Sequence, residues 1–150
     1  MDISQIHIAQ SAQETQKIGQ ELADSVIKGD PSVPKIVCFY GTLGAGKTTC
    51  IQGMAKGLGL PSRLVSPTFI IVKRYTLGRN FQSLYHIDLY RIQKDSDIKN
   101  LGLAEIFNEK NSVSVIEWAE RLGTLLPEKR IDVHMEITSG NERKIRIEYV

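Results

Sequence analysis

The residues of this chain best suited to chemistry lie between positions 41 and 48, in the sequence Gly-Thr-Leu-Gly-Ala-Gly-Lys-Thr. They fit the spacing G-x-x-x-x-G-K-[ST], in which glycines allow a tight turn whose backbone N–H groups form a nest for anions. In such a loop Lys47 reaches the β- and γ-phosphates of a nucleotide, and the Thr48 hydroxyl binds Mg²⁺. The residues expected to hold the nucleotide are Gly41, Gly44, Ala45, Gly46, Lys47, Thr48 and Thr49.

The segments on either side of this loop support a phosphate site. Residues 35–40 are apolar enough for a buried strand that runs into the loop, and residues 47–58 carry apolar side chains at helical spacing. Gly57 and Gly59 can end that helix. The alternative is a glycine-rich turn without a ligand, and the strand–loop–helix context makes it the weaker interpretation.

Two acidic residues follow predicted strands and are candidates for the same site. Asp88 lies in a strand expected over residues 81–91, and Glu117 ends an apolar strand over residues 113–117. In open α/β sheets the ligand crevice lies at the carboxyl ends of the strands. One acid would bind Mg²⁺ through its waters and the other would orient the attacking water, and the sequence leaves open which does which. Lys47, Asp88 and Glu117 are the expected catalytic residues, and Thr48, Glu117 and Asp88 the expected metal residues.

Four other side chains that could belong to the site have two interpretations each. His86 faces the same way as Asp88 and could orient its carboxylate, although a structural histidine is the simpler interpretation. Trp118 could close over the site, or it could be a core aromatic. Ser66 and Thr68 could form a switch that senses the γ-phosphate. A Ser-Pro turn before a strand explains the same segment, and the residues alone favour that turn.

The order of predicted elements indicates an α/β protein. A short strand at residues 6–8 precedes a helix that begins with a capping box, with Ser11 at the N-cap and Glu14 three residues later. Hairpins are expected from about residue 70 to 91 and from 131 to 149, with a polar turn over 94–97 and a short helix over 101–107. We therefore expect one domain over residues 1–150, a three-layer sandwich like that of phosphate-loop NTPases. Its mixed sheet would have a parallel core and antiparallel hairpins.

The composition sets limits on the class of protein. Apolar residues make up 41% of the chain and charged residues 24%, with a net charge of +2, which neither requires nor excludes a nucleic-acid partner. Basic residues gather in the last hairpin; a solvated sheet face is the favoured interpretation, and contact with RNA or an acidic partner is the alternative. Cys38 and Cys50 fall at apolar positions and are predicted to be buried free thiols. The sequence has no signal peptide pattern and no apolar run of about 20 residues, so we expect a cytoplasmic protein with no membrane contact.

Four blocks in one order resemble the TsaE family, also called YjeE. They are the phosphate loop, Ser-Pro-Thr-Phe at 66–69, His-Ile-Asp-Leu-Tyr-Arg at 86–91 and Ile-Glu-Trp at 116–118. Thr42 stands where the family commonly has aspartate, a position at which a phosphate loop uses mainly its backbone. The resemblance implies a bacterial ATPase required for threonylcarbamoyladenosine in tRNA, working with TsaB and TsaD and touching tRNA only indirectly. The ATPase step would reset that complex between turnovers.

The resemblance also implies roles for individual residues. Residues 44–49 would hold the phosphates of ATP, Thr48 would bind Mg²⁺, and Thr68 would belong to a nucleotide-sensitive segment. Asp88 would be the catalytic or Walker-B carboxylate, Glu117 would lie at the Mg²⁺ ion, and Trp118 would neighbour the nucleotide.

Other functions of a phosphate loop are weaker alternatives. A small-molecule kinase needs a lid with several arginines, and Arg74, Arg79 and Arg91 are too scattered to form one. A regulatory GTPase would carry Asn-Lys-x-Asp, which this chain lacks. A non-hydrolytic, nucleotide-gated adaptor remains a third possibility. Because no arginine finger is evident, we expect slow hydrolysis that a partner accelerates.

Overall fold

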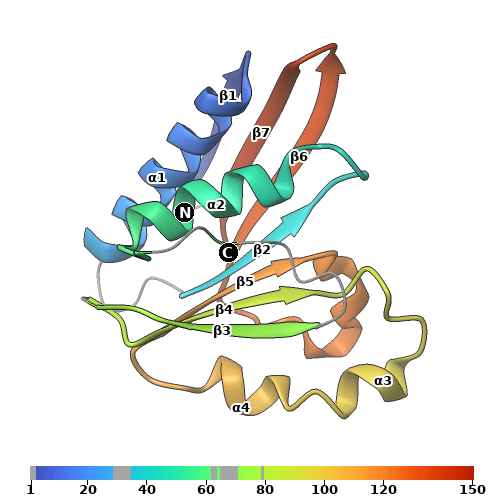
Figure 1. Cartoon of the computed structure of the whole chain (residues 1–150). Coiled ribbons are helices and arrows are strands. Elements are labelled where there is room, and N and C mark those ends of the chain that lie inside the picture. Colours follow the sequence, from blue (N-terminus) through green and yellow to red (C-terminus); the bar gives the residue numbers. More distant parts are fainter. Residues whose placement is uncertain (1–2, 29–34, 62–63, 65–70, 79) are drawn as a thin grey trace.

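The structure is a computed structural model that describes residues 3–28, 35–61, 64, 71–78 and 80–150. In these residues one sheet of seven strands has the order β1-β7-β6-β2-β5-β4-β3 (Figure 1). The strands are β1 (Ile3–Ala9), β2 (Ile36–Tyr40), β3 (Val72–Thr76), β4 (Ser83–Asp88), β5 (Ser112–Glu117), β6 (Ile131–Ser139) and β7 (Glu142–Tyr149). The helices are α1 (Ala12–Lys28), α2 (Lys47–Gly57), α3 (Asp95–Lys99), α4 (Leu103–Phe107) and the 3₁₀ segment η1 (Ala119–Leu125).

The predicted mixed sheet is confirmed. Strand β2 lies between β5 and β6 and is parallel to both, and β4 is parallel to β5. The pairs β3–β4, β6–β7 and β1–β7 are antiparallel. The carboxyl ends of β2, β4 and β5 therefore meet at one edge of the sheet, which is where the phosphate loop leaves β2.

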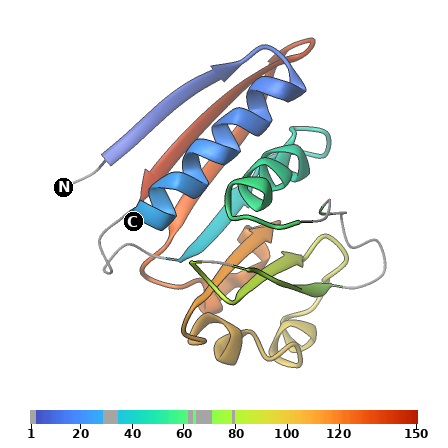
Figure 2. The same ribbon diagram turned by 60° about the vertical axis from the view of Figure 1, so that its left-hand side comes forward.

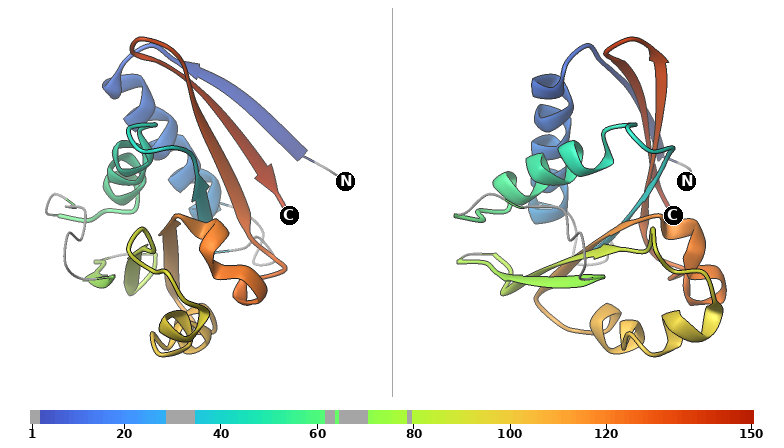
Figure 3. Two further views of the ribbon diagram at one scale, coloured as in Figure 1. Left: turned by 90° about the vertical axis from the view of Figure 1, so that its right-hand side faces the viewer. Right: turned by 45° about the vertical axis from the view of Figure 1, so that its right-hand side comes forward.

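Helices cover the two faces of the sheet unequally. Helices α1 and α2 lie together on one face, and α3, α4 and η1 lie on the other, where η1 contacts β2 (Figures 1 and 2). The apolar core accordingly has two clusters, and the one on the α3–α4 side contains buried residues of β2, β4 and β5 but none of β1, β6 or β7. No described helix packs on that side of β1, β7 and β6, which project upward as a wing (Figure 3).

Glycines allow α1 to pack directly on the backbone of α2. A Cβ atom on Gly19 would lie 2.1 Å from the carbonyl oxygen of Cys50, and one on Gly53 would lie 2.1 Å from that of Gln16. Side chains larger than hydrogen do not fit at either position without separating the helices. Helix α1 thus fixes the position of α2, the helix that follows the phosphate loop.

The predicted start of α1 is confirmed with one change of partner. The Ser11 hydroxyl accepts a hydrogen bond from the Glu14 N–H at 3.2 Å, as a capping box requires. The Glu14 carboxylate, however, accepts from the N–H of Gln10, one residue before the N-cap.

Several predicted boundaries were wrong. Residues 95–99 form α3 where a turn was expected, and α4 begins at Leu103, after Gly102 adopts a left-handed conformation. Strand β4 ends at Asp88 and not near residue 91, because Arg121 binds the carbonyl oxygens of the next residues and turns the chain. Strand β1 is longer than expected because it pairs with β7 along its whole length.

The two thiols are free and buried, as predicted. Burial raises the pKa of both Cys38 and Cys50 to about 12. Among the described helices, none combines the length and apolar character needed to cross a bilayer.

Candidate nucleotide-binding site

The loop between β2 and α2 has the backbone that its glycines predicted. Gly41 has φ 151° and Gly46 has φ 97°, both outside the range that side chains readily allow. A Cβ on Gly41 would also lie 2.5 Å from the Met135 carbonyl oxygen. Both glycines are therefore required for the loop to pass close to β6 and enter α2.

Lys47 is the first residue of α2 and is only 5% exposed. Its ammonium donates to the Gly41 carbonyl oxygen at 2.5 Å and lies 3.8 Å from the centre of the Trp118 ring. Burial lowers the pKa of Lys47, against the opposing charges of Glu117, Glu120 and Asp88. The loop thus holds a desolvated cation whose hydrogen bond goes to a neutral carbonyl, which favours an anionic ligand.

Glu117, at the end of β5, links α2 to β4. Its Oε1 accepts a hydrogen bond from the Thr48 hydroxyl at 2.9 Å, and its Oε2 lies 2.7 Å from Nε2 of His86. Glu117 is 4% exposed and His86 is fully buried. A carboxylate is therefore held, in a buried position, directly against the hydroxyl that a phosphate loop uses for Mg²⁺.

Asp88 is the register partner of Glu117 on β4 but is bound differently. Its Oδ1 accepts from the backbone N–H of Tyr90 at 3.0 Å, and the residue is partly exposed. Burial raises the pKa of Asp88; the Tyr90 N–H opposes this, and the nearby charge of Glu117 adds to it. Of the two interpretations of His86, the less favoured one named the wrong acid, since His86 binds Glu117 and not Asp88.

Trp118 forms part of the wall of the site and is half-buried. It has a left-handed backbone with φ 59°, and its ring faces Lys47 and lies 5.3 Å from the ring of Tyr90. The interpretation of Trp118 as a core aromatic was therefore incomplete. One side packs on the apolar cluster beside η1, and the residue also lines the pocket.

These groups surround one pocket of about 320 Å³. It is lined by Leu43, Gly44, Gly46, Lys47, Thr48, Thr49, Asp88, Tyr90, Glu117 and Trp118. The positive-φ loop, the buried ammonium, the Thr48 hydroxyl and two carboxylates form the donor set that a nucleotide with Mg²⁺ needs, so these residues fit both groups.

Comparisons with known proteins agree with this geometry. The family model "Threonylcarbamoyl adenosine biosynthesis protein TsaE" matches residues 9–145. The chain belongs to the TsaE family.

Relatives named tRNA threonylcarbamoyladenosine biosynthesis protein TsaE match most of the chain. The one from Bacillus subtilis is 37% identical over 89% of this chain and 78% of its own length. The one from Aquifex aeolicus is 34% identical over 98% of both. The crystal structure of Bacillus subtilis YdiB superposes with a TM-score of 0.77 at 30% identity, covering 100% of this chain and 88% of that one.

Not every residue predicted to belong to the site lines the pocket. Ala45 is buried behind the loop, and Gly41 turns its carbonyl to Lys47 without lining the pocket. Ser66 and Thr68 lie outside the described residues, so their switch role stays a prediction.

Sequence reasoning missed three contacts around the pocket. Tyr90 and Leu43 line it, and a guanidinium nitrogen of Arg143, from the β6–β7 hairpin, lies 3.4 Å from the Gly44 carbonyl oxygen. The alternation of β4 does place Tyr90 on the same side as Asp88, which was the available signal. The reach of Arg143 depends on how the hairpin packs, for which the sequence gives no signal.

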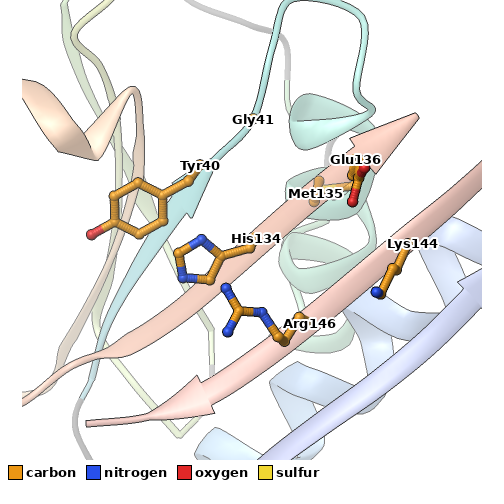
Figure 4. A pocket seen from close by; sticks show the side chains of 7 residues that line it. All are labelled: Tyr40, Gly41, His134, Met135, Glu136, Lys144 and Arg146. Atoms are coloured by element: carbon orange, nitrogen blue, oxygen red, sulfur yellow. The ribbon is translucent and has the colours of Figure 1, made fainter. Parts of the chain in front are cut away.

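A second, larger cavity of about 500 Å³ lies on the face of β2, β6 and β7 that α2 does not cover (Figure 4). The rings of Tyr40 and His134 stack there at 4.8 Å. Donor atoms of Asp132, His134 and Glu148 lie within 4.8 Å of one another. Arginines already bind both acids, Arg130 at 3.0 Å from Asp132 and Arg146 against Glu148. This group is thus an ion-pair network.

Proposed function

We propose that this chain binds ATP with Mg²⁺ and hydrolyses it in support of threonylcarbamoyladenosine modification of tRNA, acting with TsaB and TsaD. Membership of the TsaE family supports the pathway, whose name the relatives carry. The observation that carries the ATPase assignment is the 2.9 Å contact between Thr48 and Glu117 beside the buried ammonium of Lys47. It brings a loop hydroxyl, a strand-end acid and a phosphate-binding cation together.

The residues of the pocket divide the work of hydrolysis. The N–H groups of the loop and Lys47 bind the phosphates, and Lys47 exchanges its neutral carbonyl partner for an anionic oxygen. Thr48 and Glu117 would hold Mg²⁺, which supplies charge neutralisation between the phosphates. Asp88, which is the more exposed acid and is held by a backbone N–H, would orient the attacking water.

The contacts of the arginines near the site support the expectation that the isolated chain hydrolyses ATP slowly. None of the described residues that line the pocket is an arginine. The guanidinium of Arg121 binds carbonyl oxygens, including that of Ile92 at 2.6 Å, and Arg143 donates to carbonyl oxygens as well. Among the described residues that line the pocket, no guanidinium is therefore placed to stabilise charge on the transferring phosphoryl group, and we expect TsaB and TsaD to accelerate turnover.

The test measures phosphate release from ATP, with and without TsaB and TsaD, for the wild type and for Asp88→Asn and Glu117→Gln. Both variants should lose at least about 100-fold in rate, the scale typical of a general-base or electrostatic group. Glu105→Gln, an exposed acid of α4, is the matched control and should hydrolyse normally. If both variants hydrolyse ATP at the wild-type rate, the roles assigned to Asp88 and Glu117 are refuted.

Two further measurements separate the alternative functions. If cells that carry Asp88→Asn make normal amounts of the modified nucleoside while the protein binds ATP without hydrolysing it, the chain is a nucleotide-gated adaptor. If the γ-phosphate appears on a small molecule and not as free phosphate, the chain is a kinase.

A further inference from the structure

His86 is a buried histidine whose only described side-chain partner is an acid of the candidate site. Its ring is fully buried on β4, and its Nε2 lies 2.7 Å from Oε2 of Glu117. The opposite oxygen of the same carboxylate accepts from Thr48 at 2.9 Å. The two contacts bind the two oxygens of Glu117 from opposite sides, so its carboxylate cannot rotate without breaking one of them.

The chemistry of the two side chains decides which atom of this pair is the hydrogen-bond donor. An ionised carboxylate only accepts hydrogen bonds, so Nε2 of His86 must carry the hydrogen. The other nitrogen, Nδ1, is buried and has no partner among the described residues. Within the described residues, the contact between Nε2 and Glu117 is therefore the one hydrogen bond that orients the ring.

We propose that His86 is a positioning residue that fixes the Glu117 carboxylate against Thr48 for binding of the nucleotide's divalent cation. The proposal rests on the function proposed above and adds to it a residue that touches neither nucleotide nor phosphate. The two acids of the site are then held by different means. Asp88 is held by a local backbone N–H, and Glu117 by a side chain from the neighbouring strand, 31 positions away in sequence. Loss of His86 should therefore affect Glu117 and leave Asp88 in place.

Three substitutions separate positioning from packing. The amide nitrogen of Gln reaches about as far as Nε2, whereas the Asn side chain is one bond shorter and Leu has no donor. His86→Leu and His86→Asn should raise the Mg²⁺ concentration for half-maximal binding of a non-hydrolysable ATP analogue about 10- to 100-fold, the usual cost of removing a partner that orients a metal ligand. His86→Gln should restore it to within a few-fold of the wild type.

Binding of the same analogue in EDTA is the internal control. Lys47 and the loop amides are untouched, so metal-free affinity should change less than about two-fold in all three variants. Equal Mg²⁺ dependence in the Gln and Leu variants, whether both normal or both impaired, would show that His86 only fills space and would overturn the proposal.

A measurement on the wild-type protein without nucleotide keeps the proposal testable if variants unfold or ATP is not hydrolysed. A ¹⁵N-histidine spectrum should show one ring whose Nε2 carries a hydrogen-bonded proton, with signals that disappear in His86→Gln and shift in Glu117→Ala. An Nε2 without a proton would refute the pairing. An intact pair in a chain that fails to hydrolyse ATP would refute the proposed function alone.

Discussion

The contact between α1 and α2 gives the sharpest prediction about stability. In Gly53→Ala the new Cβ would lie 2.1 Å from the Gln16 carbonyl oxygen, so the helix backbones must separate by roughly 1 Å to restore ordinary contact. Overpacking of this kind lowers the free energy of unfolding by about 1–3 kcal/mol. The separated helices also lose some of their dispersion contacts, which adds to this loss. Alanine returns about 1 kcal/mol through its higher helix propensity.

The net loss for Gly53→Ala is therefore about 2 kcal/mol, or a fall in Tm of about 4–8 °C for a chain of this size. Thermal unfolding followed by circular dichroism measures it. Gly78→Ala is the matched control, because a Cβ there has no atom within 4 Å, and it should stay within about 0.5 kcal/mol of the wild type. In Gly57→Ala the new Cβ would lie 2.7 Å from the Ala23 methyl and no closer than 3.2 Å to backbone, at the Gln20 carbonyl oxygen, so this variant should fall between them. If Gly53→Ala matches or exceeds the wild-type Tm, the helices do not meet through their backbones.

Four further outcomes are expected. Lys47→Ala should weaken ATP binding by about 10- to 150-fold in calorimetry, which is the loss expected when a charge-assisted hydrogen bond is removed. Lys56→Ala in the same helix should leave ATP binding unchanged. Equal affinities of the two variants would refute the phosphate-loop assignment. Trp118 is the only tryptophan, and its fluorescence should change on titration with ATP as the ammonium leaves its ring, a change absent in Lys47→Ala. Asp88→Asn should raise Tm at pH 7 and raise it less at pH 4. Folding raises the pKa of Asp88, so its charged form destabilises the folded state. Protonation of Asp88 removes that penalty as the pH falls through the pKa of the folded state, and the substitution then gains less. The two cysteines should react with a thiol reagent at pH 8 only as fast as the protein opens; rapid reaction in the native state would contradict their burial.

Local sequence patterns predicted the site best where the chemistry is carried by neighbours in the chain. The phosphate loop and its flanking strand and helix depend on glycine conformations and apolar spacing, both of which are local. The end of β5 at Glu117 followed from a short apolar run, and the expectation that an acid there lies near the loop follows from parallel strands sharing one edge.

The errors occurred where distant segments decide the outcome. Alternation along β4 placed His86 on the correct face, but its partner depends on the register between β4 and β5, which local spacing does not set. The strand stopped at Asp88 because a guanidinium from η1 binds the carbonyl groups that follow it. Helix α3 is a single short segment with one buried residue, Ile98, so its amphipathic pattern was too brief to recognise.

The uneven covering of the sheet has a consequence for how the molecule opens. The wing of β1, β7 and β6 has a solvent-facing side, whereas β2, β5 and β4 are packed between two helical layers (Figure 3). Amide hydrogens in the wing should exchange with solvent through local opening, and those of the three inner strands only through unfolding of the whole chain. The two acids of the candidate site stand on β4 and β5, so Asp88 and Glu117 stay in place during local opening of β1 and β7.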